Sequence, residues 1–233
     1  MAVVSACQTA TPAPQTFTLA ATDLTAELAA DLVAAYRQNN AAPLINVVPQ
    51  SALAGELAAR NAQAAFTTNA PQGFYSTPIA YVSFVVVVHP NNPVNTLTLA
   101  QVQATYGGQL TDWAQVGGSA GAVQVLARED GSDGAGAFNG AALNGIAITP
   151  NAQVAATWVA MRQLIQQNPN AVGYLPASEV DATVKALTLD SELRVLIVAV
   201  APAEPTGAPR DFLAWAQSEA GQAAAQQNFF ALP

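Results

Sequence analysis

Cysteine, histidine and charged residues are scarce in this chain. Its 233 residues include one cysteine and one histidine, and only 9% of the residues are charged. A single cysteine cannot form a disulfide within the chain, and one cysteine with one histidine cannot supply the ligands of a cysteine–histidine zinc site. No Gly-Lys-Ser or Gly-Lys-Thr string is present to cradle a nucleotide phosphate, and the spacing of the acidic residues singles out no catalytic pair. The sequence therefore favours a binding protein that is not an enzyme and uses no cofactor.

Basic residues are few as well. Seven lysines and arginines stand against fifteen acidic residues, which gives a formal net charge of −8. Such a balance argues against a surface that neutralises nucleic acid or anionic lipid. The largely apolar stretch at residues 82–88 is far shorter than the ~20 residues of a membrane-spanning helix. A small anion, if bound, must be held by local donors and dipoles.

The N-terminal segment has features of a lipoprotein precursor. Val-Ser-Ala-Cys at positions 4–7 is similar to the lipobox at which bacterial lipoprotein signals are cleaved, although only six residues precede Cys7. Residues 8–15, rich in Thr, Ala, Pro and Gln, have the composition of a tether. We expect residues 1–15 to be a lipobox remnant and tether with Cys7 as the lipidation site; the alternative is an incidental small residue in a frayed terminus.

Helical and extended segments alternate along the chain. With 52% hydrophobic residues the chain can bury a core, as one large domain or two small ones. The first third predicts a strand at 16–20, a helix at 25–38 capped by Asp23, a strand at 44–48 and a helix at 53–60. A buried strand is expected at 81–89 and is expected to cross between two lobes. Further on we expect helices at 98–106, 157–166 and 209–227 and strands at 123–127 and 194–200. The fold class is α/β.

Several strings follow one another in a familiar order. They are Pro-Ile-Ala-Tyr at 78–81 leading into 85–93, Leu-Thr-Leu-Ala-Gln-Val at 97–102, Tyr-Gly-Gly at 106–108, Thr-Asp-Trp at 111–113, Val-Gly-Gly at 116–118, Asn-Ala-Val-Gly-Tyr at 170–174, Phe-Leu-Ala-Trp at 212–215 and Glu-Ala-Gly-Gln at 219–222. Together they resemble the phosphate-binding-protein branch of the periplasmic binding-protein superfamily. The resemblance covers nearly everything after residue 16.

The resemblance implies a type II periplasmic-binding-protein fold with a ligand cleft between two lobes and two hinge crossings. Lobe 1 would span 16–80 and 176–233, and lobe 2 would span 81–175. It also implies an extracytoplasmic solute-binding protein of an ABC importer, a monomer that binds a small tetrahedral oxyanion, above all phosphate. Its partners would be that anion and a membrane permease, with no nucleic acid and no membrane contact except through a lipid anchor.

A glycine-rich loop at 128–138 resembles the anion loop of that family. Arg128, Gly131, Ser132, Asp133 and Gly134 would be its ligand residues, because arginine offers a planar fork, serine a hydroxyl, and glycine a close approach to backbone N–H groups. The alternative is a surface turn in which the arginine pairs with the neighbouring Glu129 or Asp130.

Two further segments are candidates in lobe 1. Thr22, Asp23, Leu24 and Thr25 form an expected strand-to-helix turn with hydroxyl and N–H donors, although an ordinary helix cap would use the same residues. The other segment contains Thr68 and Asn69, at a place where many relatives carry Ser-Asp-Ala-Pro. Binding and structural roles are about equally supported there.

Two residues depart from the family pattern. Asp133 places a carboxylate where relatives have a bare glycine, so it must turn away, pair with a cation or accept a proton from the ligand. Asn69 replaces an acid that some relatives use to accept the proton of hydrogen phosphate. The ligand could therefore be sulfate, molybdate or tungstate, or the chain could be a ligand-free sensor or protein-interaction module.

Overall fold

The structure, a computed structural model, describes residues 16–38 and 40–232. The expected tether at 1–15 and its lipidation site Cys7 lie outside the described residues, so both stay predictions. Within the described residues, no helix combines the length and the apolar character needed to cross a membrane.

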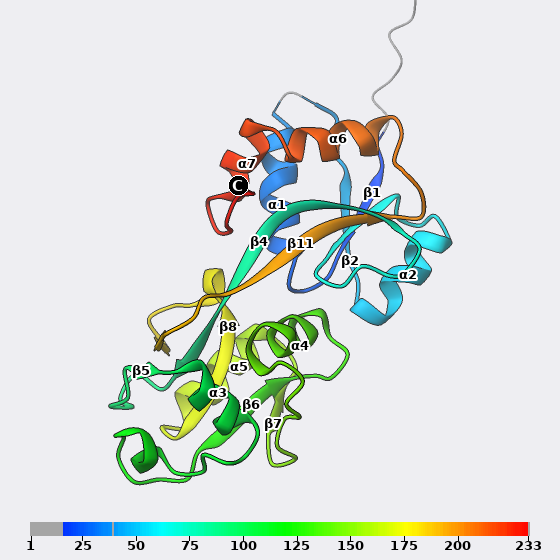
Figure 1. Cartoon of the computed structure of the whole chain (residues 1–233). Helices are drawn as coiled ribbons and strands as arrows, with labels where there is room; N and C mark the ends of the chain where they lie inside the picture. The colour runs from blue at the N-terminus through cyan, green and yellow to red at the C-terminus, as the bar shows by residue number, and fades with distance from the viewer. Residues whose placement is uncertain (1–15, 39, 233) are drawn as a thin grey trace, which may run out of the picture.

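The chain forms two lobes joined by long strands (Figure 1). Lobe 1 contains β1 (Thr18–Ala21), α1 (Ala26–Tyr36), β2 (Leu44–Val47), α2 (Gln50–Ala58), β3 (Ala64–Thr67), α6 (Ala208–Ala216) and α7 (Glu219–Ala225). Lobe 2 contains β5 (Thr96–Leu97), α3 (Leu99–Tyr106), η1 (Trp113–Val116), β6 (Gln124–Arg128), α4 (Asp133–Phe138), η2 (Asn139–Leu143), β7 (Gln153–Ala155), α5 (Trp158–Gln167) and β8 (Ala171–Pro176). The expected two-lobed α/β fold is confirmed.

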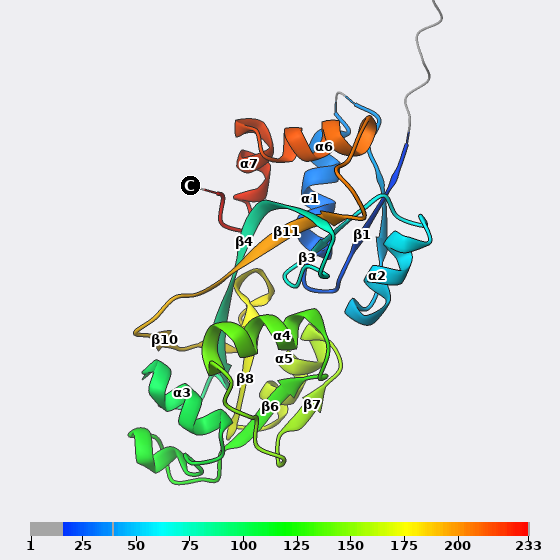
Figure 2. The same ribbon diagram turned by 45° about the vertical axis from the view of Figure 1, so that its right-hand side comes forward.

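One mixed sheet runs through both lobes, in the order β2-β1-β3-β11-β4-β8-β6-β7. The strands β4 (Tyr75–Val88) and β11 (Leu193–Ala201) are antiparallel, and both extend from lobe 1 towards lobe 2 (Figure 2). β4 pairs with β11 through Phe84 and then with β8 from Phe84 to Val88. The expected crossing strand at 81–89 is therefore confirmed, and it begins six residues earlier than the sequence suggested, at Tyr75.

Each lobe has an aromatic core. In lobe 1, Phe17 and Tyr36 pack edge-on against Phe212. In lobe 2, Phe138 lies flat on Tyr174, with ring centroids 3.7 Å apart and planes 2° apart. Both rings of this stacked pair are fully buried. This core fixes the end of α4, and α4 carries the loop expected to bind an anion.

The structure corrects the expected C-terminal helix. The expected helix at 209–227 is two helices, α6 and α7, because Ser218 begins a new helix by accepting the Gly221 N–H on its hydroxyl. The sequence also gave no prediction for β3 and β7, two short strands of four and three residues.

Candidate functional site

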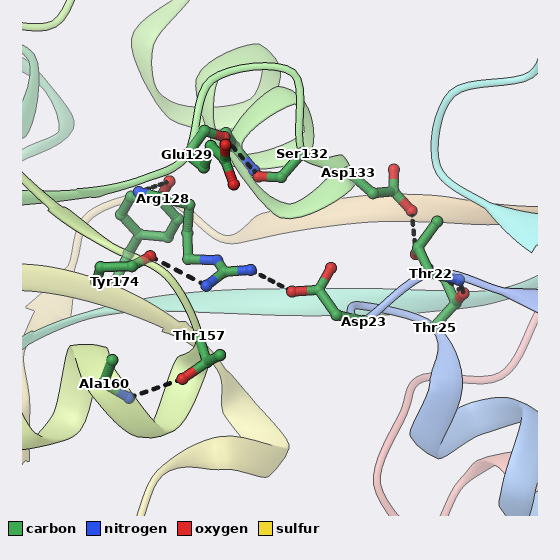
Figure 3. Close-up of polar contacts among 12 residues, drawn as sticks. Thr22, Asp23, Thr25, Arg128, Glu129, Ser132, Asp133, Thr157, Ala160 and Tyr174 are labelled. Carbon is green, nitrogen blue, oxygen red and sulfur yellow. Dashed lines mark hydrogen bonds and ion pairs between the residues drawn. The ribbon is translucent and has the colours of Figure 1, made fainter. Parts of the chain in front are cut away.

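Three connections meet where the lobes face each other. They are the segment after β3, the turn between β1 and α1, and the loop between β6 and α4, of which Figure 3 shows the last two. Beside them lies a cleft of about 500 Å³ lined by residues of both lobes, among them Asp23, Gln50, Ser51, Arg128, Ser132 and Asp133. Gln50 and Ser51 open α2 directly after a strand, and sequence reasoning missed them. Their position at the end of β2 was the available signal.

Arg128 is the last residue of β6, and its side chain is only 4% exposed. Its Nη2 forms an ion pair with the carboxylate of Asp23 in lobe 1, and its Nη1 donates to the carbonyl oxygen of Ala155 at 3.1 Å. The guanidinium lies over the indole ring of Trp158, 4.4 Å from the ring centroid. Its Nε is buried and makes no hydrogen bond within the described residues. Arg128 is thus held in the interlobe region and does not pair with Glu129 or Asp130 at the surface.

Asp23 does not cap α1 as expected. The residue before the helix is Thr25, and no side chain caps the helix there. The Asp23 carboxylate extends across the cleft to Arg128, and its side chain stays 41% exposed. An opposite charge in the facing lobe is a stronger partner for a carboxylate than a backbone N–H, which explains the different orientation.

Asp133 is buried, with 2% of its surface exposed, although it is the first residue of α4. Its Oδ2 accepts a hydrogen bond of 2.6 Å from the Thr22 hydroxyl. Its Oδ1 accepts from the Thr68 hydroxyl, and the Thr68 N–H lies 3.2 Å from Oδ1 and 3.3 Å from Oδ2. Asp133 neither turns into solvent nor pairs with a cation, and its role as acceptor of a ligand proton stays a prediction. The carboxylate accepts hydrogen bonds from uncharged donors in lobe 1. The sequence of the loop that carries Asp133 contains no signal for these partners.

Burial raises the pKa of Asp133 above its ordinary value. The hydrogen bonds from Thr22 and Thr68 counteract part of the rise, and the negative charge of Asp23 adds to it. A carboxyl in this environment binds a proton more readily than one in water.

The remaining residues of the loop have structural contacts. Ser132 begins α4: its hydroxyl accepts the Ala135 N–H at 3.2 Å and donates to the Glu129 carbonyl oxygen at 2.7 Å. Gly131 is exposed with a φ of +79°, a conformation that favours glycine. Gly134 packs so closely on Trp158 that an added Cβ would lie 2.5 Å from the indole ring.

The other lobe 1 candidates, apart from Asp23, divide into three groups. Thr22 and Thr68 point their hydroxyls at Asp133. Leu24 lies in the hydrophobic core at 3% exposure, and the Thr25 hydroxyl donates to the Phe66 carbonyl oxygen at 2.9 Å. Asn69 is exposed and, with Thr68, lines a separate groove.

Tyr174 of β8 holds the start of the β6–α4 loop through a hydrogen bond to Arg128. Its phenolic oxygen accepts a hydrogen bond of 3.1 Å from the buried backbone N–H of Arg128. Burial raises the pKa of Tyr174 to about 12, so the phenol stays protonated.

Tyr174→Phe should cost about 1–3 kcal/mol of unfolding free energy, because the Arg128 N–H would remain buried without a partner. Urea denaturation measures this. Tyr106→Phe is a matched control with a smaller expected loss, since that hydroxyl makes a long bond of 3.4 Å to the Leu126 carbonyl oxygen.

Two features bear on catalysis. The chain has a Gly-x-Ser-x-Gly string at 117–121, but it lies between η1 and β6 and not in the strand–turn–helix of a nucleophile elbow. Among residues 16–38 and 40–232, no three His, Cys, Asp or Glu side chains gather in a way that could hold a metal ion.

Solved structures with the same fold include phosphate receptors and a regulatory domain. A putative phosphate ABC transporter substrate-binding protein with bound phosphate from Clostridium perfringens is 24% identical, with a TM-score of 0.83 over 94% of this chain and 100% of that one. An ABC-type phosphate transport receptor from Vibrio cholerae is 23% identical, with a TM-score of 0.74 over 93% and 100%. The reduced OxyR regulatory domain from Pseudomonas aeruginosa is 13% identical, with a TM-score of 0.63 over 86% and 93%.

These similarities establish the fold. The family is established by a sequence model of the PBP superfamily domain, which matches residues 9–210. The chain therefore belongs to the periplasmic-binding-protein (PBP) superfamily.

Proposed function

We propose that this chain is the extracytoplasmic solute-binding protein of an ABC importer and binds a small tetrahedral oxyanion, phosphate above all, between its lobes. It acts by binding and is not an enzyme. The partners are the anion and a membrane permease, and the protein works as a monomer. Cys7 carries the lipid that keeps it at the outer face of the cell membrane.

One observation carries this proposal: hydrogen-bond donors from both lobes converge beside one cleft and already hold carboxylate oxygens. Arg128 of lobe 2 holds the carboxylate of Asp23, and Thr22 and Thr68 of lobe 1 hold that of Asp133. A carboxylate and a tetrahedral oxyanion present the same kind of acceptor, so donors that suit one suit the other. The phosphate bound to the Clostridium perfringens relative supports phosphate as the first ligand to test.

The proposed function includes a change in the angle between the lobes. An anion that contacts donors of both lobes stabilises the closed form by its difference in affinity for the two forms. The first lobe boundary near residue 80 is part of this proposal. The expected second boundary at 176 stays a prediction. The pairing of β9 (Lys185–Ala186) with β4 and of β10 (Thr188–Leu189) with β5 favours a later boundary, at β11.

Calorimetric titration tests the anion proposal. Dialysed protein is titrated with phosphate, sulfate, molybdate and tungstate, with acetate and chloride as controls. We expect saturable binding of at least one tetrahedral anion and none of the controls. If the wild type, Asp133→Asn and Asp133→Gly all fail to bind any tetrahedral anion, the proposal is wrong.

A second function is favoured by the carboxylates that already occupy the donors. A protein whose lobes already satisfy each other's polar groups could serve as a ligand-free sensor or protein-interaction module. The OxyR regulatory domain shows that the fold is not restricted to importers. For this function, none of the wild type and Asp133 variants would bind an anion.

A further inference from the structure

Asp133 joins the two lobes through contacts that are distant in the chain. It belongs to α4 in lobe 2, whereas Thr22 and Thr68 belong to lobe 1, 111 and 65 residues away in sequence. Two hydroxyls and one backbone N–H of lobe 1 are directed at its two oxygens. An ionised carboxylate can only accept hydrogen bonds, so all three lobe 1 groups act as donors.

A second bridge joins the same two regions, but here lobe 1 supplies the carboxylate and lobe 2 the donor. The Asp23 carboxylate, next to Thr22, pairs with the Arg128 guanidinium, five residues before Asp133. Each lobe thus offers one carboxylate to the polar groups of the other. Figure 3 shows both bridges side by side, Asp23 with Arg128 and Thr22 with Asp133.

The contacts of Asp133 are those that a bound anion would need. Thr22 and Thr68 offer three donors, and the Asp133 oxygens accept from all of them. The Thr22 hydroxyl lies 2.6 Å from Oδ2, and the Thr68 backbone nitrogen lies 3.2 Å from Oδ1 and 3.3 Å from Oδ2. An anion placed on the same donors would also lie against an ionised carboxylate, and like charges at contact distance repel strongly in a buried site.

We propose that Asp133 is an internal ligand, which closes the lobes on each other without a solute and competes with the solute for Thr22 and Thr68. The competition rests on the proposed function, whereas the closure does not. A solute binds only when the Asp133 carboxylate leaves these donors or takes up a proton. The anion affinity of the wild type is therefore reduced by the fraction of molecules in which the donors are free.

The proposal predicts that anion affinity depends on pH. The charged groups around Asp133 are Asp23 with its partner Arg128, the exposed Glu129 and Asp130 of the same loop, and Arg194 of β11, which lines a groove together with Thr68. The segment that follows β3, residues 68–72, has no ionisable side chain.

The sign of the dependence follows from the loss of the Asp133 proton as the pH rises, and the raised pKa moves the change to a higher pH than for an ordinary aspartate. Below that pKa the carboxyl is neutral, and it loses its proton as the pH rises. Sulfate affinity should therefore fall with rising pH, by at most about tenfold per pH unit for one proton. Sulfate is the probe because it does not titrate in this range. Asp133→Asn should remove the dependence.

Closure without a solute is tested by small-angle X-ray scattering of the ligand-free protein. The wild type should be compact, and Asp133→Gly should have a larger radius of gyration that sulfate reduces. In calorimetry, Asp133→Gly should bind sulfate roughly tenfold or more tightly than the wild type, since the competing group is gone. Asp130→Asn is the matched control, because it removes one negative charge from the same loop at an exposed position; its scattering curve should equal that of the wild type.

Thr68→Val gives a second measurement that does not alter α4. Valine keeps the shape of threonine and removes one donor to Asp133, so the ligand-free protein should open without any gain in sulfate affinity. If neither Asp133→Gly nor Thr68→Val changes the ligand-free scattering curve, Asp133 does not close the lobes. If sulfate affinity and its pH dependence are the same in the wild type and Asp133→Asn, Asp133 does not compete. If the variants open but bind none of the four anions, the closure stands and the proposed function is wrong.

Discussion

Arg128→Ala is expected to weaken anion binding by about 2–5 kcal/mol, roughly 30-fold to several-thousand-fold, as is usual when one member of a buried charge-assisted pair is removed. The Arg128 side chain is 4% exposed beside the cleft, and Asp23 would remain there as an uncompensated negative charge. Both changes disfavour an anion. Calorimetry with the best-binding anion measures the loss.

The same variant should also lose stability, because Arg128 contacts Ala155 and Trp158 within lobe 2. Unfolding in urea therefore has to be measured beside the titration. Arg128→Lys retains the charge without the planar fork and should recover only part of the affinity. The double variant Arg128→Ala with Asp23→Asn removes the leftover charge and should bind better than Arg128→Ala alone. Unchanged affinity beside a large loss of stability would mean that Arg128 is purely structural.

Phe138→Ala should lower the free energy of unfolding by about 3–5 kcal/mol, the usual cost of truncating a buried phenylalanine. The ring is fully buried and stacks on Tyr174 at 3.7 Å, with Phe84 and Tyr106 edge-on or tilted beside it. Removing the ring leaves a cavity under α4. Urea denaturation followed by circular dichroism measures the change.

The control for this variant is Val159→Ala on α5, because Val159 is 51% exposed. Its expected effect is within about 0.5 kcal/mol, as for most surface substitutions. A loss of under 1 kcal/mol in Phe138→Ala would mean that the lobe 2 core can close around the missing ring. Such a result would contradict the tight packing described above.

The long elements could be predicted from local pattern, and the short ones could not. The crossing strand was recognisable because residues 81–88 combine aromatic and β-branched side chains in one run. By contrast, β3 has the sequence Ala-Ala-Phe-Thr, and its strand state comes from pairing with β1 and β11 on either side. The break between α6 and α7 was hidden because Ser218 stands among alanines and glutamines that also suit a continuous helix.

For the site, the sequence indicated which residues come together, but it did not indicate which of them contact one another. Arg128, Thr22, Thr68 and Asp133 were all candidates, and the structure brings them together at the interlobe region. Their pairing depends on contacts more than 60 residues apart in sequence, which local reasoning cannot supply. Repulsion between Asp133 and an anion follows from charge alone, whereas the contacts of its carboxylate with Thr22 and Thr68 depend on how the two lobes face each other.

The connection between the lobes is a hydrogen-bonded ladder, and this determines how the molecule can bend. β4 and β11 remain paired from one lobe into the other, so a change in lobe angle must twist both strands together. The pairing shifts at one bulge, where Ile197 faces Ala80 but Val198 faces Pro78. Pro78 has no N–H to give to the ladder, so fewer hydrogen bonds oppose a local twist at this bulge than in the regular part of the ladder. For any twist at this point, the far end of lobe 2 would travel farther than the residues beside the bulge.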